Sequence, residues 1–145
     1  MKSFALISLI ICAATAKTVS HRQKFVDQDW VYTSKFGAPA NSMVTASVNA
    51  RILNYVRQQS EQNLVYFEAA IYTDERWEEV EKMTDASCQQ KRALAAQTIA
   101  IAVGLSGEWS QFNGQNLPSE TKIYSADRPH IFYFVIMDCN GHFRD

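Results

Sequence analysis

The sequence lacks the short motifs that carry enzyme chemistry or hold phosphate groups. It contains no Gly-x-Ser-x-Gly nucleophile motif, no His-Glu-x-x-His zinc motif and no glycine-rich phosphate-binding loop. The three histidines, His21, His130 and His142, are far apart along the chain. Cys139 and His142 have the spacing of metal ligands, but two ligands do not make a zinc site. We therefore predict a protein with no enzymatic activity, no catalytic residues, no bound metal and no cofactor.

Long apolar runs are missing after the N-terminal region, and so are clusters of basic residues. A helix that spans a bilayer needs about 20 apolar residues, whereas the later apolar runs, at 98–105 and 131–137, are far shorter. The chain has 14 lysines and arginines against 15 aspartates and glutamates, and the basic residues are scattered. This charge distribution excludes the basic surface that a nucleic acid requires.

The N-terminus is the exception to this shortage of apolar runs. Lys2 is followed by a short apolar segment, and Ala14 and Ala16 stand directly before polar residues. A positive start, a short apolar run and a pair of small residues at this spacing are typical of a secretory signal peptide. We predict a signal peptide over 1–16, cleaved after Ala16, and a polar tether over 17–29. The protein is then expected in the secretory pathway, in an extracellular or lumenal space.

Cysteine is scarce, with three residues in the chain. Cys12 lies in the predicted signal peptide, which leaves Cys88 and Cys139. In an oxidising compartment two cysteines most simply form one disulfide, although two free buried thiols are the alternative. The bond would stabilise the fold by about 4 kcal/mol in the chain-entropy model. Since no Asn-x-Ser/Thr triplet occurs, we expect no glycan on asparagine.

Six segments have the composition or the alternation of β-strands. In the segment 43–53, valine, alanine and isoleucine alternate with polar residues, which is the pattern of a half-buried antiparallel strand. The segment 98–103 alternates in the same way. The predicted strands are 30–36, 43–53, 64–72, 98–103, 121–125 and 131–138.

One segment has the spacing of a short helix. Asp74 is in position to cap a helix over 74–83 that carries Trp77 and Val80 on one stripe. The residues 88–97 fit either a helix or a loop. Six strands with one short helix insert predict a mainly β fold, an antiparallel β-sandwich.

The strand predicted at 131–138 has no polar face, so both of its sides should be buried. We expect Phe134→Ala to cost about 3–5 kcal/mol of stability. Asn140 and Gly141 then favour a hairpin turn, but the sequence ends before a second arm. This pattern predicts a domain over 30–145 that is truncated at its C-terminal edge, with an open edge beside 131–138 and a tendency to self-associate.

Three groups of residues are candidates for function or for ordinary structure. Trp109 and Phe112, in a long polar segment, form a possible binding patch or plug the end of the sandwich. The segment Arg128-Pro129-His130 fits a structural role in which Arg128 pairs with an acidic residue. An acidic cluster fits the solvated face of a helix better than an acid–base or calcium site, and its members are Glu75, Glu78, Glu79, Glu81 and Asp85.

The order of these features resembles a known family. An aromatic strand at 30–36, a helix with Trp77, a cysteine at Cys88 and the segment 128–139, in which Arg-Pro-His leads into an aromatic strand that ends in Cys139, together cover about residues 25–143. They resemble the N-terminal luminal GOLD-type domain of the intimal-thickness-receptor family. That family consists of orphan seven-helix membrane proteins sometimes grouped with G-protein-coupled receptors. The family's seven-helix bundle is absent from this sequence.

The resemblance implies a non-catalytic luminal or extracellular recognition domain with a GOLD or jelly-roll-like sandwich, acting in receptor signalling or secretory trafficking. It implies a protein partner, and it carries over no functional residues beyond the pair Cys88 and Cys139. The alternative is a stand-alone secreted carrier of a small apolar ligand. A pocket lined by Tyr66, Tyr133 and other aromatics would favour the carrier, whereas an open sheet edge beside 131–138 would favour the truncated receptor domain.

Overall fold

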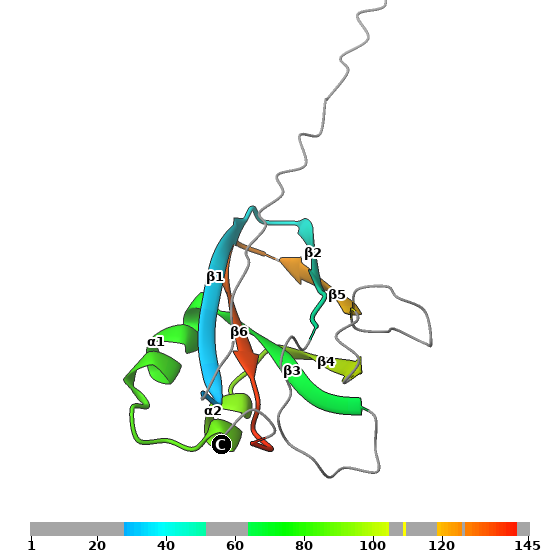
Figure 1. Ribbon diagram of the computed structural model, residues 1–145. Helices are drawn as coiled ribbons and strands as arrows, with labels where there is room; N and C mark the ends of the chain where they lie inside the picture. The colour runs from blue at the N-terminus through cyan, green and yellow to red at the C-terminus, as the bar shows by residue number, and fades with distance from the viewer. Residues whose placement is uncertain (1–27, 52–63, 105–108, 110–118, 126, 142–145) are drawn as a thin grey trace, which may run out of the picture.

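The computed structural model describes residues 28–51, 64–104, 109, 119–125 and 127–141, and this part of the chain is mainly β (Figure 1). The whole predicted signal peptide lies outside the described residues, as do most of the predicted tether, His21, His142 and Phe112. The strands are β1 (Trp30–Ala38), β2 (Ser42–Val48), β3 (Leu64–Thr73), β4 (Gln97–Gly104), β5 (Ser119–Ser125) and β6 (His130–Met137). The helices, both between β3 and β4, are α1 (Asp74–Lys82) and α2 (Cys88–Arg92).

The elements form three layers (Figure 1). A four-stranded antiparallel sheet, in the order β1-β6-β3-β4, lies between the helices on one face and the two-stranded sheet β2-β5 on the other. This arrangement confirms the predicted mainly β, antiparallel sandwich. The structure adds a second helix that the sequence pattern left undecided.

The space between the two sheets is filled by side chains. Alternate residues of the strands point into it, which is the period of two expected for half-buried strands. The buried members are Ala38, Val44, Ala46, Val65, Phe67, Ala69, Ile71, Ile99, Ile101, Val103 and Phe132. The alternation predicted for 43–53 and 98–103 is therefore confirmed where it is described. The strand β2 ends at Val48, earlier than predicted, because its partner β5 begins opposite that residue, at Ser119.

The strand β6 is covered on both faces, as predicted, except that Ile131 at its start is 39% exposed. Phe134 and Ile136 pack into the space between the sheets, while Val135 and Met137 pack under the helices. The open edge expected beside this strand is wrong, because β1 pairs with one edge of β6 and β3 with the other. The edges of the four-stranded sheet are β1 and β4 instead. Phe134 is only partly buried, so the largest loss of packing is now expected at Phe132.

The junction between β3 and α1 corrects the predicted helix cap. Thr73, the last residue of β3, is the N-cap, and its side chain makes no capping hydrogen bond. Asp74 is the first helical residue, and its carboxylate binds Arg128 and His130. The strand runs directly into the helix, so Asp74 lies within the first turn, where its carboxylate binds the side chains of Arg128 and His130 at the start of β6.

The helix α2 begins with a capping box, and it is connected to the sheet by its first residue and by the turn that follows it. The hydroxyl of Ser87 accepts a hydrogen bond from the backbone N–H of Gln90, and the Gln90 side chain accepts one from the backbone N–H of Ser87. Cys88 forms the predicted disulfide with Cys139, directly after β6, with a Cα–Cα distance of 5.2 Å. The backbone N–H of Ala96 donates to the carbonyl of Ile71 in β3. These contacts hold α2 against the four-stranded sheet.

Candidate functional site

A β-bulge in β1 determines which of its side chains face the helices. Tyr32 lies opposite Val135 and Ser34 lies opposite Phe134, so Thr33 is an extra residue in the pairing with β6. The Thr33 hydroxyl donates a hydrogen bond of 2.8 Å to the carbonyl of Phe134. Strict alternation would place Phe36 on the same face as Trp30 and Tyr32. The bulge places Lys35 there instead, because Lys35 pairs with Tyr133.

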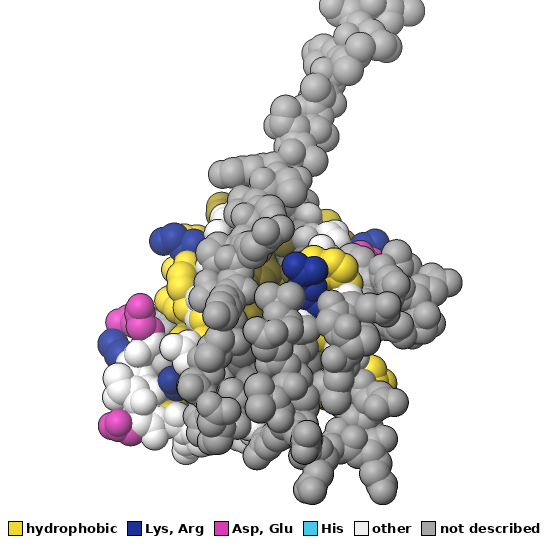
Figure 2. Space-filling view, viewed as in Figure 1, with side chains coloured by type: hydrophobic (Ala, Val, Ile, Leu, Met, Phe, Trp, Pro, Cys, Tyr) yellow, Lys and Arg dark blue, Asp and Glu magenta, His cyan; other side chains and the backbone are white. Residues whose placement is uncertain are grey.

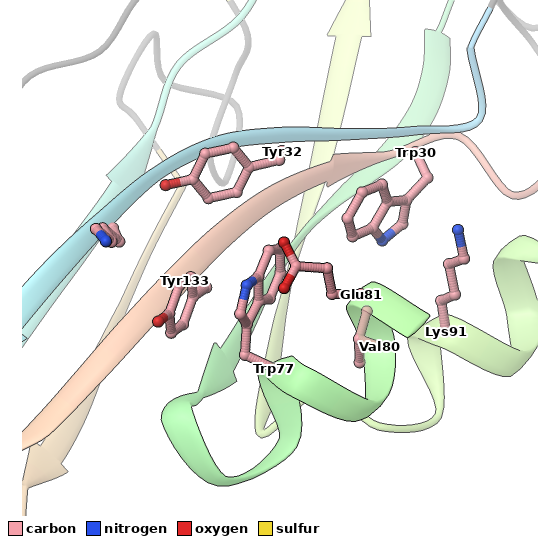
Figure 3. Close-up of a pocket in the computed structure, with 8 residues that line it drawn as sticks. Trp30, Tyr32, Trp77, Val80, Glu81, Lys91 and Tyr133 are labelled. Atoms are coloured by element: carbon pink, nitrogen blue, oxygen red, sulfur yellow. The ribbon is translucent and has the colours of Figure 1, made fainter. Parts of the chain in front are cut away.

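Four aromatic side chains gather where β1 and β6 meet α1 (Figure 3). The ring of Trp77 stacks on Tyr133 with centroids 4.4 Å apart and an interplanar angle of 3°. Trp30 lies nearly parallel to Trp77 at 5.9 Å, and Tyr32 is tilted against it at 5.3 Å. These distances are those of favourable aromatic pairs. We call the surface formed by Trp30, Tyr32, Trp77 and Tyr133 the aromatic groove.

The aromatic groove is a hollow of about 460 Å³ that is open to solvent. The residues that line it are Trp30, Tyr32, Lys35, Trp77, Val80, Glu81, Lys91 and Tyr133. Tyr32 is 41% exposed, and hydrophobic side chains are visible along β1 in the space-filling view (Figure 2). The other three aromatics, Trp30, Trp77 and Tyr133, are partly buried. Aromatic side chains that reach the surface of a hollow are typical of binding sites.

Buried residues beneath the groove hold its helical wall in place. Val80 of α1 is buried against the sheet, which fixes the helix face that presents Trp77. Tyr72 is fully buried, and its hydroxyl donates a hydrogen bond of 3.0 Å to the carbonyl of Lys91. Burial raises the pKa of Tyr72, so the hydroxyl keeps its proton for this bond. The bond positions Lys91 at one end of the groove.

Charged groups line the groove without pairing with one another. The ammonium group of Lys91 lies 4.7 Å from the ring centre of Trp30, a cation–π contact. Lys35 is exposed on β1, and Glu81 extends from α1. In the part of the chain that the structure describes, none of these three residues forms an ion pair.

The segment Arg128-Pro129-His130 fastens the start of α1 to the start of β6. Arg128 bonds the carboxylates of Asp74, at 3.0 Å, and Glu75, at 2.6 Å. Nδ1 of His130 lies 2.8 Å from the other oxygen of Asp74. This confirms the structural role predicted for the segment and the predicted pairing of Arg128. Among the described residues no serine hydroxyl or free thiol is within hydrogen-bonding distance of His130.

We expect Asp74→Asn to lower the free energy of unfolding by about 1 kcal/mol near neutral pH. Burial alone would raise the pKa of the Asp74 carboxyl group, but hydrogen bonds from His130 and Arg128 outweigh it and hold the pKa below its ordinary value of 3.8. A lowered folded pKa means that the stabilisation is present above the unfolded pKa, near 4, and is lost as the pH falls through the folded value.

Urea unfolding of the natural chain and of Asp74→Asn from pH 7 to pH 3 measures this effect. The difference between the two proteins should shrink below about pH 4. Asp85→Asn is the control, because Asp85 is exposed, and its effect should stay small at every pH. A difference for Asp74→Asn that is constant over the range would contradict the proposed charge interaction.

The binding patch predicted at Trp109 and Phe112 is only partly described, and Trp109 lies outside the aromatic groove. Trp109 is 44% exposed, and the guanidinium of Arg51 lies 4.9 Å from its ring centre. Phe112 lies outside the described residues, so the patch stays a prediction. Tyr133 lines the aromatic groove, as the carrier hypothesis expected, but Tyr66 lines a separate hollow of about 240 Å³ beside α2. The two tyrosines therefore do not share one pocket.

The predicted solvated acidic face of α1 is in part an ion-pair surface. Glu78 pairs with Lys82, and Glu79 with Arg76, within the helix. No group of three or more histidine, cysteine or acidic side chains positioned for a metal occurs among the described residues. No helix in the described ranges has the length and apolarity needed to span a membrane.

Of the four groove aromatics, the sequence pattern marks only Tyr133 as a candidate pocket residue. Trp77 fits a helix stripe and Trp30 and Tyr32 fit a strand, and the contact between them depends on how α1 packs on the sheet. The Ser-x-x-Gln pattern at Ser87–Gln90 would have predicted the start of α2 and so the position of Lys91. The bulge at Thr33 has no comparable sequence pattern.

Comparisons with protein-family models, with curated proteins and with solved structures found no match to this chain. The resemblance to the luminal domain of the intimal-thickness-receptor family therefore stays a prediction.

Proposed function

We propose that this chain is a non-catalytic recognition domain of the secretory pathway that binds a partner protein through the aromatic groove. The observation that carries the proposal is the open hollow in which Trp30, Tyr32, Trp77 and Tyr133 converge from two strands and a helix (Figure 3). Aromatic side chains are enriched at protein interfaces, and they dominate the binding energy there. On this proposal the domain is the luminal or extracellular part of a seven-helix, receptor-like membrane protein that acts in signalling or trafficking.

Two features support the assignment to the secretory pathway. The sequence begins with a segment typical of a signal peptide. The disulfide between Cys88 and Cys139 is of a kind that persists in oxidising compartments and is rare in the cytosol.

The second candidate function is that of a carrier of a small apolar ligand. The aromatic lining of the groove favours this function. A volume of about 460 Å³ is within the range of small-molecule sites. However, carriers enclose most of the ligand surface, whereas this hollow is open and the space between the two sheets is filled by side chains. An open aromatic surface suits a segment of a protein better than an enclosed small molecule.

A peptide library displayed on phage and panned against the purified chain tests the proposal. We expect binders that lose affinity about tenfold on Tyr32→Ser, because truncating an aromatic at an interface centre costs more than about 1 kcal/mol. Tyr124→Ser is a matched control, since Tyr124 is also an exposed strand tyrosine, 56% exposed, but lies on β5 in the other sheet. Its effect should stay within about twofold.

Two outcomes contradict the proposal. Peptides that bind with equal affinity to the natural chain and to Tyr32→Ser would place recognition elsewhere. A library that yields no binder, together with saturable binding of a fatty acid, a sterol or indole that Tyr32→Ser weakens, would favour the carrier.

A further inference from the structure

We infer that the occupant of the aromatic groove is an extended, proline-containing segment of the partner protein with a carboxylate near each end. This inference rests on the proposed function and names the class of ligand for the same site. Three properties of the groove carry it: its aromatic surface, the two lysines at its ends, and the single glutamate on its helical wall.

The aromatic surface fits a polyproline II helix. Such a segment is preformed in the free state, so it loses little entropy on binding, and its proline rings pack against the faces and edges of grouped aromatic side chains. Trp30, Trp77 and Tyr133 form a row in which neighbouring rings are nearly parallel, and Tyr32 tilts against the middle of that row. A row of rings suits a ligand that repeats an apolar ring along its length.

The two lysines give the groove a positive charge at each end. Lys91 lies over Trp30, where β1 begins, and Lys35 lies farther along the same strand, beyond the bulge. At about 3.3 Å per strand residue, the backbone positions of Trp30 and Lys35 are about 15 Å apart. A polyproline II segment rises about 3.1 Å per residue, so about five residues cover this span. Carboxylates at both ends of such a segment would reach the two ammonium groups.

The negative charge of Glu81 disfavours acidic residues in the middle of the ligand, so we expect them only at the ligand's ends. Glu81 lines the groove from α1 and forms no ion pair with another described residue. A ligand that is acidic along its whole length would bring like charges together at Glu81, which is unfavourable. An apolar centre with acidic ends avoids this repulsion while it pairs with Lys35 and Lys91.

Tryptophan fluorescence of the purified chain tests the inference, because Trp30 and Trp77 line the groove. The probe is a blocked peptide of four prolines with an aspartate at each end. The comparison peptides replace both aspartates by lysines, or the prolines by glycines. We expect the acidic proline peptide to bind at least about tenfold more tightly than either comparison peptide at low salt, and to weaken as salt is raised.

Substitutions separate the contribution of the lysines from a general charge effect. Lys35→Gln and Lys91→Gln should each weaken the acidic proline peptide by about three- to tenfold. Lys122→Gln is the control, because Lys122 is an exposed lysine on β5, and its effect should stay within about twofold.

The inference and the proposed function fail in different ways. If the library yields groove binders but the lysine-ended or glycine peptide binds as tightly as the acidic proline peptide, the ligand class is wrong and the proposed function stands. If neither the library peptides nor the acidic proline peptide depends on Tyr32, both are wrong. If the acidic proline peptide binds with the expected dependence on Lys35 and Lys91, both are supported.

Discussion

Replacing both disulfide cysteines, in the variant Cys88→Ser with Cys139→Ser, is expected to lower the free energy of unfolding by about 4 kcal/mol. The bond joins residues 51 positions apart, and closing a loop of this length removes about that much conformational freedom from the unfolded chain in the chain-entropy model. The bond also ties α2 to the end of β6. Because α2 carries Lys91, loss of the disulfide should loosen one end of the aromatic groove as well.

Urea unfolding with and without dithiothreitol measures the contribution of the disulfide. The reductant should destabilise the natural chain by about the same amount as the double substitution and should leave the double variant unchanged. Comparing the reduced natural chain with the double variant therefore separates the loss of the disulfide from any effect of the two serine side chains. A loss below about 1 kcal/mol in both comparisons would mean that the packing of α2 on the sheet suffices without the bond.

Phe132→Ala is expected to cost about 3–5 kcal/mol, the range for removing a fully buried aromatic side chain. Phe132 is 1% exposed and belongs to the core between the two sheets, where it lies opposite Phe36 of β1 and Thr73 of β3. Its removal therefore leaves a cavity at the strand that joins both halves of the four-stranded sheet. Such a loss is a large fraction of the stability of a small domain.

Phe134→Ala is the matched comparison for this substitution. Phe134 is on the same strand and the same face, but it is only partly buried. We expect a smaller loss of unfolding free energy than for Phe132→Ala, because less apolar surface returns to water. Thermal unfolding followed by circular dichroism compares the two. Equal losses, or a larger loss at Phe134, would show that the packing around β6 differs from that described.

The strands were predictable because their burial follows a local pattern. Ile99, Ile101 and Val103 alternate with small or polar residues, and this alternation alone indicates which face is buried. The apolar character of β6 likewise predicted a strand covered on both sides. The order of the strands was not predictable in this way, because the pairing of β6 with both β1 and β3 depends on contacts far apart in sequence. The expected open edge beside β6 was wrong for that reason.

The candidate site was less predictable than the fold. The disulfide followed from the number of cysteines and the expected compartment. An acidic partner was predicted for Arg128, but its identity as Asp74 and Glu75 depends on how α1 packs beside β6. The aromatic groove depends on a bulge of one residue at Thr33 and on the packing of α1 against β1 and β6. A change of register by one residue reverses which side chains face the helices, and periodicity alone does not reveal where such a change occurs.

The three tryptophans allow a direct test of the claim that the aromatic groove is the binding site. Each indole N–H gives its own signal in a proton–nitrogen correlation spectrum of the labelled chain. On addition of a peptide recovered from the library, or of the acidic proline peptide, we expect the signals of Trp30 and Trp77 to shift. The signal of Trp109, which lies beside Arg51 and outside the groove, should stay in place. A shift confined to Trp109 would contradict the account and place binding at the Trp109 patch.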